Sequence, residues 1–359
     1  MVQSYDWQAG LELFDRPAFA ASAGRITFVN QAAQKQMIEM GQAVAPLLLT
    51  GAEEYAAFTD GCLWLTVRVM GATRGAAVHI MDGTSVFLLD QEQEGLQMMA
   101  LAAQNLRRPL GNIMTATDRL FPALSKMEDP AIAQQMAWIN QGLYQLLRIV
   151  GNMADAEQYQ VMAAPNLEET ELGAYFAELF HKAQTLCQGK EVLIAFTRPA
   201  QPVFAAIDRS KLERAVYNLL SNALRYTPKG GRIAARVELA GSKAVLRILD
   251  SGEGLAQEVR QSLFSRYRRT PTIEDGRHGI GLGLLLVRQV AAMHGGAVLI
   301  GPEAGGGTMA AISLDLKTRP ELQLRSPRVP VDYAGERDHC LIELSDVLPD
   351  AAFDVSKIN

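Results

Sequence analysis

The sequence predicts a multidomain α+β protein in which a small α+β module is followed by an antiparallel helical hairpin and an α/β sandwich. Three observations predict this fold class: short apolar runs separated by turn residues at 8–91, apolar residues recurring every three or four positions at 92–160, and alternating strand and helix patterns at 165–316. The segment 317–359 contains several prolines and is expected to be a tail with one short element at Leu341 to Leu344. The length of 359 residues fits two or three domains.

The composition excludes several classes of protein. Hydrophobic residues make up 48% and charged residues 20% of the chain, which excludes a mainly disordered protein. The chain has 34 Lys and Arg against 39 Asp and Glu, and its net charge of −5 argues against nucleic acid as a partner. Three cysteines lie far apart without metal-ligand spacing, which favours a reducing compartment over a disulfide framework.

No stretch predicts a membrane span, which needs about 20 mostly apolar residues. The best candidate, Gly279 to Ile300, is interrupted by Arg288, Gln289 and His294. The first residues lack the basic start and apolar core of a secretory signal. We therefore expect a cytoplasmic protein without a membrane span.

The first module is expected to contain strands and one helix. Gly24 to Asn30 reads as a turn and a strand, and Gln31 to Met40 as a helix. Further strands are expected at 63–70, 76–81 and 84–89, and Asp82-Gly83 is typical of a tight hairpin turn between the last two.

Two heptad patterns predict the helical hairpin. They run through Leu96, Met99, Ala103, Leu106, Leu110, Ile113, Thr117 and Leu120, and through Ile132, Met136, Ile139, Leu143, Leu146, Val150 and Met153. The break between them contains Pro122, Asp129 and Pro130. One hairpin cannot cover its own apolar seams, so we expect a dimer that forms a four-helix bundle; the alternative is two core helices of a monomer. Pro109 lies within the first helix, where a proline costs about 3 kcal/mol and kinks the helix.

In the α/β segment, helices are expected at 172–186, 208–226 and 281–294, and strands at 191–196, 203–207, 232–239, 243–250, 297–300 and 308–314. Two stretches there carry glycines, Asp250-Ser-Gly252-Glu-Gly254 and Gly279-Ile-Gly281-Leu-Gly283. Glycines allow a ligand to approach the backbone closely, and a helix N-terminus favours phosphate. Neither stretch matches a dinucleotide fingerprint or a P-loop.

A third stretch, Asn218-Leu-Leu-Ser-Asn222-Ala-Leu-Arg225-Tyr226-Thr227, lies on the helix expected at 208–226. Asn218 and Asn222 share a helix face, and Arg225 lies one turn further on. Amides and a cation on one face could hold phosphates and a phosphate-bound magnesium ion. Taken alone, the same pattern also suits a solvated polar face.

Together, the three stretches resemble the histidine-kinase-like ATP-binding domains of the GHKL class. Asn218 to Ala223 resembles the N box, Asp250 to Gly254 the G1 box, Leu263-Phe264-Ser-Arg-Tyr-Arg268 the F box, and Gly279 to Gly283 the G2 box, while Gly307-Thr308 matches the final strand signal. Order and spacing agree over roughly Asp208 to Leu314. Four boxes in order are a far more specific signal than a single glycine motif.

The resemblance implies an α/β sandwich that binds ATP and Mg²⁺. It assigns the adenine amino group to Asp250, magnesium to Asn222, and the phosphate and ribose side to Asn218, Arg225 and Tyr226. The remaining ATP-site residues that it implies are Gly252, Gly254, Phe264, Gly279, Gly281, Gly283 and Thr308. Residues 255–278 would form the ATP lid.

One position favours phosphoryl transfer over hydrolysis. In hydrolytic relatives such as gyrase and the heat-shock chaperones, a glutamate four residues before the magnesium-binding asparagine activates water. Here that position is Asn218, whose amide cannot act as a general base.

The hairpin resembles the HisKA dimerisation domain of sensor histidine kinases, in which a phosphoacceptor histidine is followed by Glu, Leu, Arg, Thr, Pro and Leu. This chain reads Gln104-Asn105-Leu-Arg-Arg108-Pro109-Leu. The match accounts for Pro109. It also places Gln104 at the phosphoacceptor position, where an amide lacks the nucleophilic lone pair of imidazole. Asn105 replaces the acidic residue, and none of the five histidines lies on this helix.

The N-terminal module resembles a PAS domain at Pro17, Gly24, Ile26, Asn30 and Ala32. This resemblance implies a sensor, and a bare structural or dimerising module is the alternative.

These resemblances imply a sensor histidine kinase family protein in two-component signal transduction, a homodimer or heterodimer through the hairpin, with a response regulator or a partner histidine kinase as a possible partner. We expect no autophosphorylation at the usual position, and action in trans or through a partner kinase. The alternative is a non-enzymatic ATP-binding regulator that sequesters a kinase or response regulator. An anti-sigma serine kinase, which shares the ATP domain but lacks the hairpin, is a further option.

Overall fold

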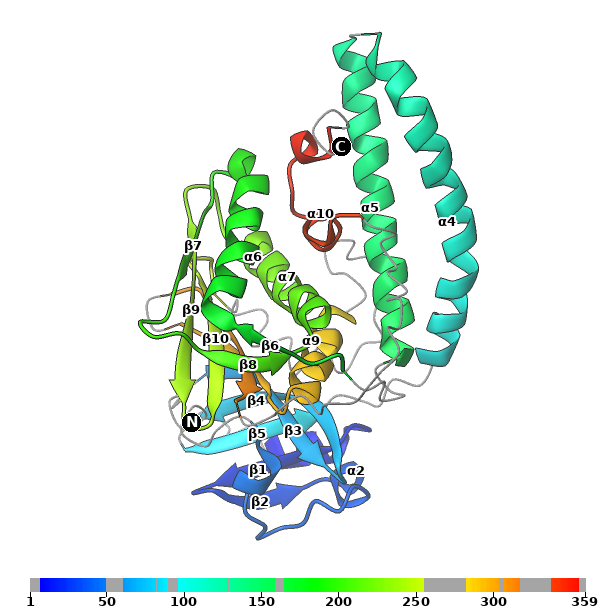
Figure 1. Ribbon diagram of the computed structural model, residues 1–359. Coiled ribbons are helices and arrows are strands. Elements are labelled where there is room, and N and C mark those ends of the chain that lie inside the picture. The colour runs from blue at the N-terminus through cyan, green and yellow to red at the C-terminus, as the bar shows by residue number, and fades with distance from the viewer. Residues whose placement is uncertain are drawn as a thin grey trace, which may run out of the picture.

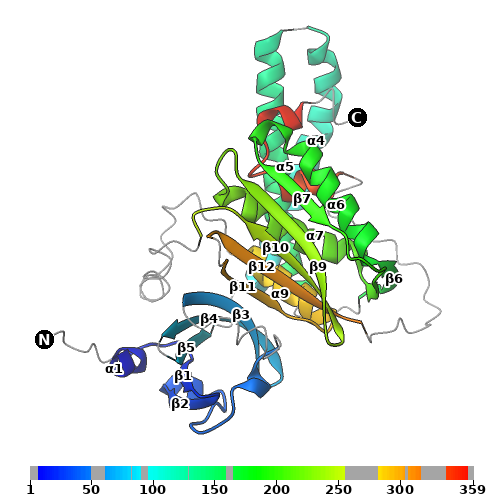
Figure 2. The same ribbon diagram turned by 90° about the vertical axis from the view of Figure 1, so that its left-hand side faces the viewer.

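The computed structural model describes residues 7–49, 61–81, 83–89, 96–127, 129–158, 165–254, 282–303, 306–316 and 337–354. Within these ranges, most strands join one ten-stranded sheet in the order β2-β1-β5-β4-β3-β11-β12-β10-β9-β7 (Figures 1 and 2). The first half of this sheet comes from the N-terminal residues, and the second half from residues after 190.

The N-terminal part contains α1 (Trp7–Glu12), β1 (Ala18–Ser22), β2 (Arg25–Val29), α2 (Gln31–Gln34), the 3-10 turn η1 (Ala45–Leu47), β3 (Gly61–Val69), β4 (Ala72–Met81) and β5 (Thr84–Leu89). Asn30 holds the first strand and the first part of α2 together. The buried Asn30 Oδ1 accepts hydrogen bonds from the Ala18 and Ala33 amides, so that it caps α2 and fixes β1 beside it.

Two expectations for this part were wrong in detail. The helix expected to reach Met40 ends at Gln34, because Met37 adopts a left-handed backbone with φ of 59° and Ile38 turns into the core. Strand β4 begins at Ala72 rather than at residue 76. Met70 and Gly71 both have positive φ, which forms a tight turn and lets β4 pair with β3 from its first residue.

Two long helices follow, α4 (Leu96–Ser125) and α5 (Pro130–Gln158), which pack side by side in opposite directions (Figure 1). The break expected around Pro122 lies later in the chain, since α4 contains both Pro109 and Pro122 and continues to Ser125. Ten of the seam positions expected from the heptads fall into two sets of five. Ala103, Leu110, Met136, Leu143 and Val150 are buried, whereas Leu106, Ile113, Leu120, Ile139 and Leu146 are exposed.

The α/β part contains β6 (Glu168–Glu171), α6 (Leu172–Leu186), the 3-10 turn η2 (Gln188–Lys190), β7 (Leu193–Thr197), β8 (Phe204–Ile207), α7 (Arg209–Tyr226), β9 (Arg232–Ala240), β10 (Lys243–Asp250), α9 (Leu282–Met293), β11 (Val298–Pro302) and β12 (Thr308–Asp315). Helices α6, α7 and α9 share one core with the inward residues of the sheet, including Ile233, Leu246 and Ile312. Strand β7 begins two residues later than expected, because Glu191 has a left-handed backbone.

The two halves of the sheet meet where β3 pairs antiparallel with β11. Leu65 lies opposite Leu299 and Trp64 opposite Ile300. The buried Thr66 hydroxyl adds contacts of 3.3–3.5 Å with the backbone of Val298. Strand β3 of the N-terminal part therefore covers β11, which would otherwise be an edge strand of the α/β part.

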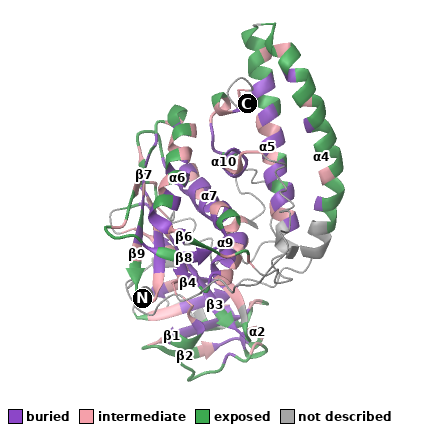
Figure 3. Cartoon of the chain, viewed as in Figure 1, coloured by how far each residue is buried: buried purple, intermediate pink, exposed green. Residues whose placement is uncertain are grey.

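The C-terminal segment Arg337–Asp354 contains α10 (His339–Glu343) and the 3-10 turn η3 (Asp350–Phe353), whereas the sequence predicted a tail with one short element at 341–344. It contacts α5, α6 and α7, and its side chains Cys340, Ile342, Glu343, Leu344 and Phe353 are fully buried (Figure 3). Cys187 and Cys340 are buried free thiols, and burial raises the pKa of Cys187 to about 11. No helix in the described ranges has the length and apolar character needed to cross a membrane.

Candidate nucleotide-binding site

Helix α7 carries the N-box pattern, and both of its ends are fixed. Asp208 caps the N-terminus by accepting a hydrogen bond from the Lys211 amide at 3.2 Å. The Asp208 amide in turn donates to Nε2 of the buried His294 at 2.8 Å. At the other end, the Thr227 hydroxyl donates to the Ala223 carbonyl oxygen at 2.7 Å. The helix that presents the candidate residues is thus held in one position by its neighbours.

Asn218 faces inward and is only 2% exposed. Its amide Nδ2 donates to the Arg214 carbonyl oxygen and to Glu343 Oε2, each at 3.0 Å. Its Oδ1 accepts from Arg148 Nη2 at 3.4 Å. The amide therefore joins α7 to α5 and to the C-terminal segment.

The other N-box residues lie progressively nearer the solvent along α7. Asn222 is partly buried one turn after Asn218, and Tyr226 at the end of the helix is exposed. Arg225 is partly exposed, and its Nη2 lies 3.4 Å from Asp346 Oδ2. An amide oxygen and a cation thus lie near the surface on the same part of the helix.

Asp250 ends β10 and is 8% exposed. Its Oδ1 accepts hydrogen bonds from the backbone amides of Gly252 at 3.0 Å and Thr308 at 3.1 Å. Burial raises the pKa of this carboxyl above its usual range, and the two amide donors offset only part of that effect. A buried carboxylate of this kind can select a ligand that donates a hydrogen bond.

Three glycines occupy positions where a side chain would collide with this site. A Cβ on Gly252 would lie 2.5 Å from the Tyr226 carbonyl oxygen, and one on Gly307 would lie 1.9 Å from the Asp250 carbonyl oxygen. A Cβ on Gly283 would lie 2.7 Å from Asn218 Oδ1. The absence of side chains therefore lets the end of β10 approach the end of α7, and lets the start of α9 approach the middle of α7 at Asn218.

The structure brings together most of the residues expected from the sequence. Asn218, Asn222, Arg225 and Tyr226 lie on α7, next to the Asp250, Gly252, Gly254 and Thr308 cluster, and Gly283 lies against Asn218. Phe264, Gly279, Gly281 and the lid expected at 255–278 lie outside the described residues. Gln104 is exposed on α4, a different helix from the one that carries the N box.

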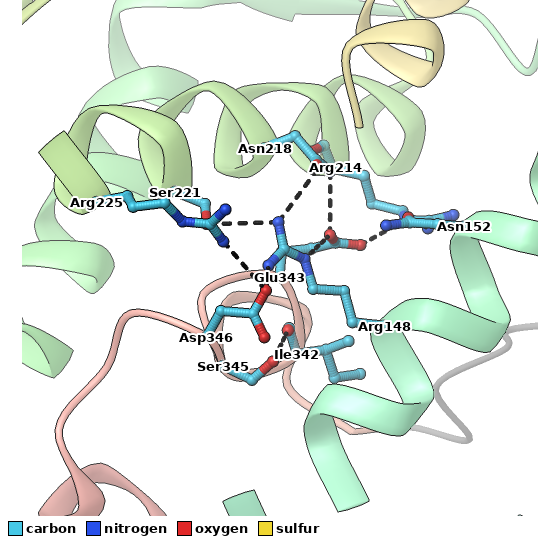
Figure 4. Close-up of polar contacts among 10 residues, drawn as sticks. All are labelled: Arg148, Asn152, Arg214, Asn218, Ser221, Arg225, Ile342, Glu343, Ser345 and Asp346. Carbon is cyan, nitrogen blue, oxygen red and sulfur yellow. Dashed lines mark hydrogen bonds and ion pairs between the residues drawn. The ribbon is translucent and has the colours of Figure 1, made fainter. Parts of the chain in front are cut away.

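Figure 4 shows a buried polar cluster that the sequence analysis missed. Glu343, whose side chain is 0% exposed, accepts from Arg214 Nε at 2.8 Å and lies 3.5 Å from Arg148 Nε. Arg148 Nη1 also lies 2.5 Å from Asp346 Oδ2. Arg214 Nη2 donates to Asn152 Oδ1 at 3.0 Å. The cluster connects α5, α7 and the C-terminal segment beside Asn218.

No group of three or more histidine, cysteine or acidic side chains in the described ranges is arranged to hold a metal ion. At Gly252, Gly283 and Gly307, the space that a Cβ would take is already filled by atoms of the protein itself.

Comparisons with known proteins agree with this geometry. Residues 207–318 match the family described as "Histidine kinase-, DNA gyrase B-, and HSP90-like ATPase". Sensor protein kinase PmrB of Pseudomonas aeruginosa is 30% identical over 242 residues, which are 64% of this chain and 47% of PmrB. Hybrid signal transduction histidine kinase D of Dictyostelium discoideum is 29% identical over 227 residues, 61% of this chain and 15% of that protein. The chain therefore spans less than half of each of these relatives.

Among solved structures, the histidine kinase ThkA in complex with the response regulator TrrA matches 88% of this chain and 99% of that chain, with 16% identity and a TM-score of 0.36. A TM-score this low does not relate the overall arrangement of the two proteins. The residues matched by the ATPase family include Asn218, Asp250 and Gly283. Residues 207–318 of this chain are therefore a histidine kinase-, DNA gyrase B- and HSP90-like ATPase domain, and its homologues include sensor histidine kinases.

Proposed function

We propose that this protein binds Mg²⁺-ATP at the end of α7 and acts in two-component signalling as a member of the sensor histidine kinase family. The single observation that carries the proposal is the packing of α7 within the matched ATPase domain, where the end of β10 meets α7 at Tyr226 and the start of α9 meets it at Asn218. Glycines at 252, 283 and 307 permit these close approaches, because a side chain at any of the three would collide with neighbouring atoms.

Each residue has a role in this proposal. The ionised carboxylate of Asp250 accepts a hydrogen bond from the adenine amino group, which selects adenine over guanine. The amide oxygen of Asn222 coordinates the magnesium ion. Arg225 and Tyr226 contact the phosphate and ribose side. Because Asn218 is an amide, it does not activate water, and the site favours transfer of the γ-phosphoryl group over hydrolysis.

A second part of the proposal concerns the acceptor. Gln104, Asn105 and Arg108 lie on the exposed side of α4, where the resemblance places the phosphoacceptor and its neighbours. An amide nitrogen is conjugated with its carbonyl and does not attack a phosphoryl group. The protein therefore does not autophosphorylate at this position and acts in trans or through a partner kinase.

The protein is also proposed to dimerise through α4 and α5. Leu106, Ile113 and Leu120 follow each other at seven-residue spacing on α4, and each is about half exposed. Ile139 and Leu146 are similarly exposed on α5. A second copy covering these side chains would complete a four-helix bundle, which is the arrangement that the heptads predict. Residues 8–91 are proposed to be a PAS-like sensor.

The nucleotide proposal is tested by isothermal titration calorimetry with Mg²⁺-ATP. We expect saturable binding to the wild-type protein, lost when magnesium is chelated. Asn222→Ala and Asp250→Asn should each abolish or strongly weaken it. Asn112→Ala on the exposed face of α4 is the matched control and should bind as the wild type does. Absence of binding to the wild-type protein would contradict the proposal.

A second candidate function is that of a non-enzymatic ATP-binding regulator that sequesters a kinase or a response regulator. Gln104 favours it, because a protein that has no acceptor of its own can still change conformation with nucleotide. The two functions differ when the purified protein is mixed with labelled ATP and a histidine-bearing kinase that cannot bind ATP. Label on that kinase supports action in trans, whereas tight association without label supports the regulator.

A further inference from the structure

The C-terminal segment Arg337–Asp354 contacts both α5 and α7. α5 presents hydrogen-bond donors at steps of four and three residues, Gln134, Trp138, Gln141, Gln145 and Arg148. Gln134 and Trp138 donate to Asp350 Oδ2 at 3.0 and 2.7 Å, Gln141 to the Ser345 and Leu348 carbonyl oxygens at 3.1 and 3.3 Å, and Gln145 to the Ser345 carbonyl oxygen at 3.4 Å. One face of α5 therefore binds this segment along its length.

Apolar side chains hold the same segment in place. Leu341, Leu344 and Leu348 belong to the main core of the α/β part, and the Phe353 ring packs against Tyr144 of α5 at 5.6 Å between ring centres. The segment is thus packed as a part of the core and is joined to both neighbouring helices.

Its two carboxylates reach the N-box helix. Glu343 accepts from Asn218 and Arg214, and Asp346 lies 3.4 Å from Arg225 and 2.5 Å from Arg148. Figure 4 shows both carboxylates on the side of α7 that carries Asn218, Ser221 and Arg225. These two carboxylates therefore contact Asn218 and Arg225, the side chains that are expected to lie near the phosphates of ATP.

We propose that the facing sides of α5 and α7 are a recognition surface for this acidic C-terminal segment, and that docking of the segment competes with the phosphates of ATP for Arg225 and Asn218. The inference rests on the proposed ATP site. Asp346 contacts Nη2 of Arg225, so a phosphate oxygen that binds through the same nitrogen has to displace Asp346 from it. By linkage, the docked segment weakens ATP binding and ATP weakens docking by the same factor.

Two single substitutions test the competition. Asp346→Asn removes the ion pairs with Arg225 and Arg148, while its partly exposed position lets the protein fold. Asp350→Asn is the matched control, because it removes one negative charge from the same segment, and among the described residues its carboxylate hydrogen-bonds to Gln134 and Trp138 of α5 and not to α7. We expect calorimetry to show about fivefold tighter Mg²⁺-ATP binding for Asp346→Asn, the lower end of typical coupling, and no change for Asp350→Asn.

Hydrogen exchange provides the reciprocal test on the full-length wild-type protein. Saturating Mg²⁺-ATP should accelerate exchange at the amides of Leu344 and Leu348, which bond within the docked segment. Equal ATP affinity in all three proteins, or exchange that ATP leaves unchanged or slows, would overturn the competition while ATP binding stands. If neither the wild type nor any variant binds ATP, the proposed function itself has failed.

Discussion

The helices α4 and α5 have almost the same length and the same heptad pattern, yet they are covered very differently (Figure 3). On α4, one row of side chains that includes Ala103, Leu110 and Met114 is buried against α5, and most of the remaining residues are exposed. α5 is buried on a second face as well, where it contacts α9, α10 and η3. Asp118 of α4 reaches the C-terminal segment through Arg337 at 2.6 Å.

The difference shows that an apolar repeat predicts one buried face and leaves the other faces undetermined. α5 differs from α4 by its row of polar donors, which binds the C-terminal segment and the buried cluster around Glu343. α4 has Gln104 and a row of half-exposed leucine and isoleucine side chains instead. α5 therefore connects to the ATPase domain, and the exposed apolar rows of α4 and α5 are the surfaces at which we propose that a second copy binds.

The largest effect is expected on the α5 side, from Glu343→Ala. The substitution leaves Arg148 and Arg214 buried without their carboxylate, and breaking a buried ion pair in this way costs about 3–5 kcal/mol. The free energy of unfolding, measured by urea denaturation, should fall by that amount. Glu178→Ala on the exposed face of α6 is the control and should change it by less than about 0.5 kcal/mol. Equal effects of the two variants would show that the cluster does not hold α5 to α7.

On α4, Ile113→Glu should dissociate the proposed dimer. It places a charge in the middle of the exposed apolar row, and we expect association to weaken about a hundredfold, or ~2.7 kcal/mol. Light scattering over a concentration series measures this change. Asn112→Glu adds the same charge at the neighbouring exposed position and should leave the dimer intact. A wild-type protein that is monomeric at all concentrations would contradict the role given to α4.

A smaller effect is expected from Trp138→Phe, which removes the hydrogen bond from Trp138 Nε1 to Asp350 Oδ2. Loss of this partly exposed bond should lower the unfolding free energy by about 1 kcal/mol. It should also increase hydrogen exchange in η3 without changing the oligomeric state. A change in dimerisation would mean that the two faces of α5 are coupled.

We expect the pH dependence of stability to act through His294, a buried side chain that follows α9. Burial lowers the pKa of His294, so the native state keeps the neutral ring, which accepts a hydrogen bond from the Asp208 amide. The unfolded state takes up a proton near the ordinary value of about 6.5, so it binds more protons just below that pH. Stability should therefore decrease as pH falls below about 6.5.

Thermal denaturation between pH 5 and 8 measures this loss. His294→Gln should flatten the profile over that range, at the cost of a lower overall stability. His181→Gln, which replaces an exposed histidine on α6, should keep the wild-type profile. A flat wild-type profile would show that His294 does not report on the packing of α9 against α7.

Much of the fold was predictable, because the patterns that formed it are local. The strand that ends in Asp250 and the helix that carries Asn218 and Asn222 lie close to their expected positions. Local backbone geometry explains the errors. The helix after Asn30 stopped early at the left-handed Met37, and Pro122 did not end α4.

The contacts of the C-terminal segment could not be predicted in the same way. Glu343 meets Arg148 and Arg214 only in the folded chain, and a glutamate in a short apolar element gives no sign of its partners. One signal was present, since Gln134, Gln141, Gln145 and Arg148 follow a helical repeat of their own. Such a row is also what a solvated face looks like, and only the structure identifies what covers it.

The most direct test of the account is incorporation of labelled phosphate from γ-labelled ATP into the wild-type protein and into the double variant Gln104→His with Asn105→Glu. The account predicts that the wild type binds ATP but acquires no acid-labile label, because α4 has no acceptor. The double variant should acquire acid-labile label on residue 104. Acid-labile label on the wild-type protein would contradict the central claim that the ATP site is present and its acceptor is missing.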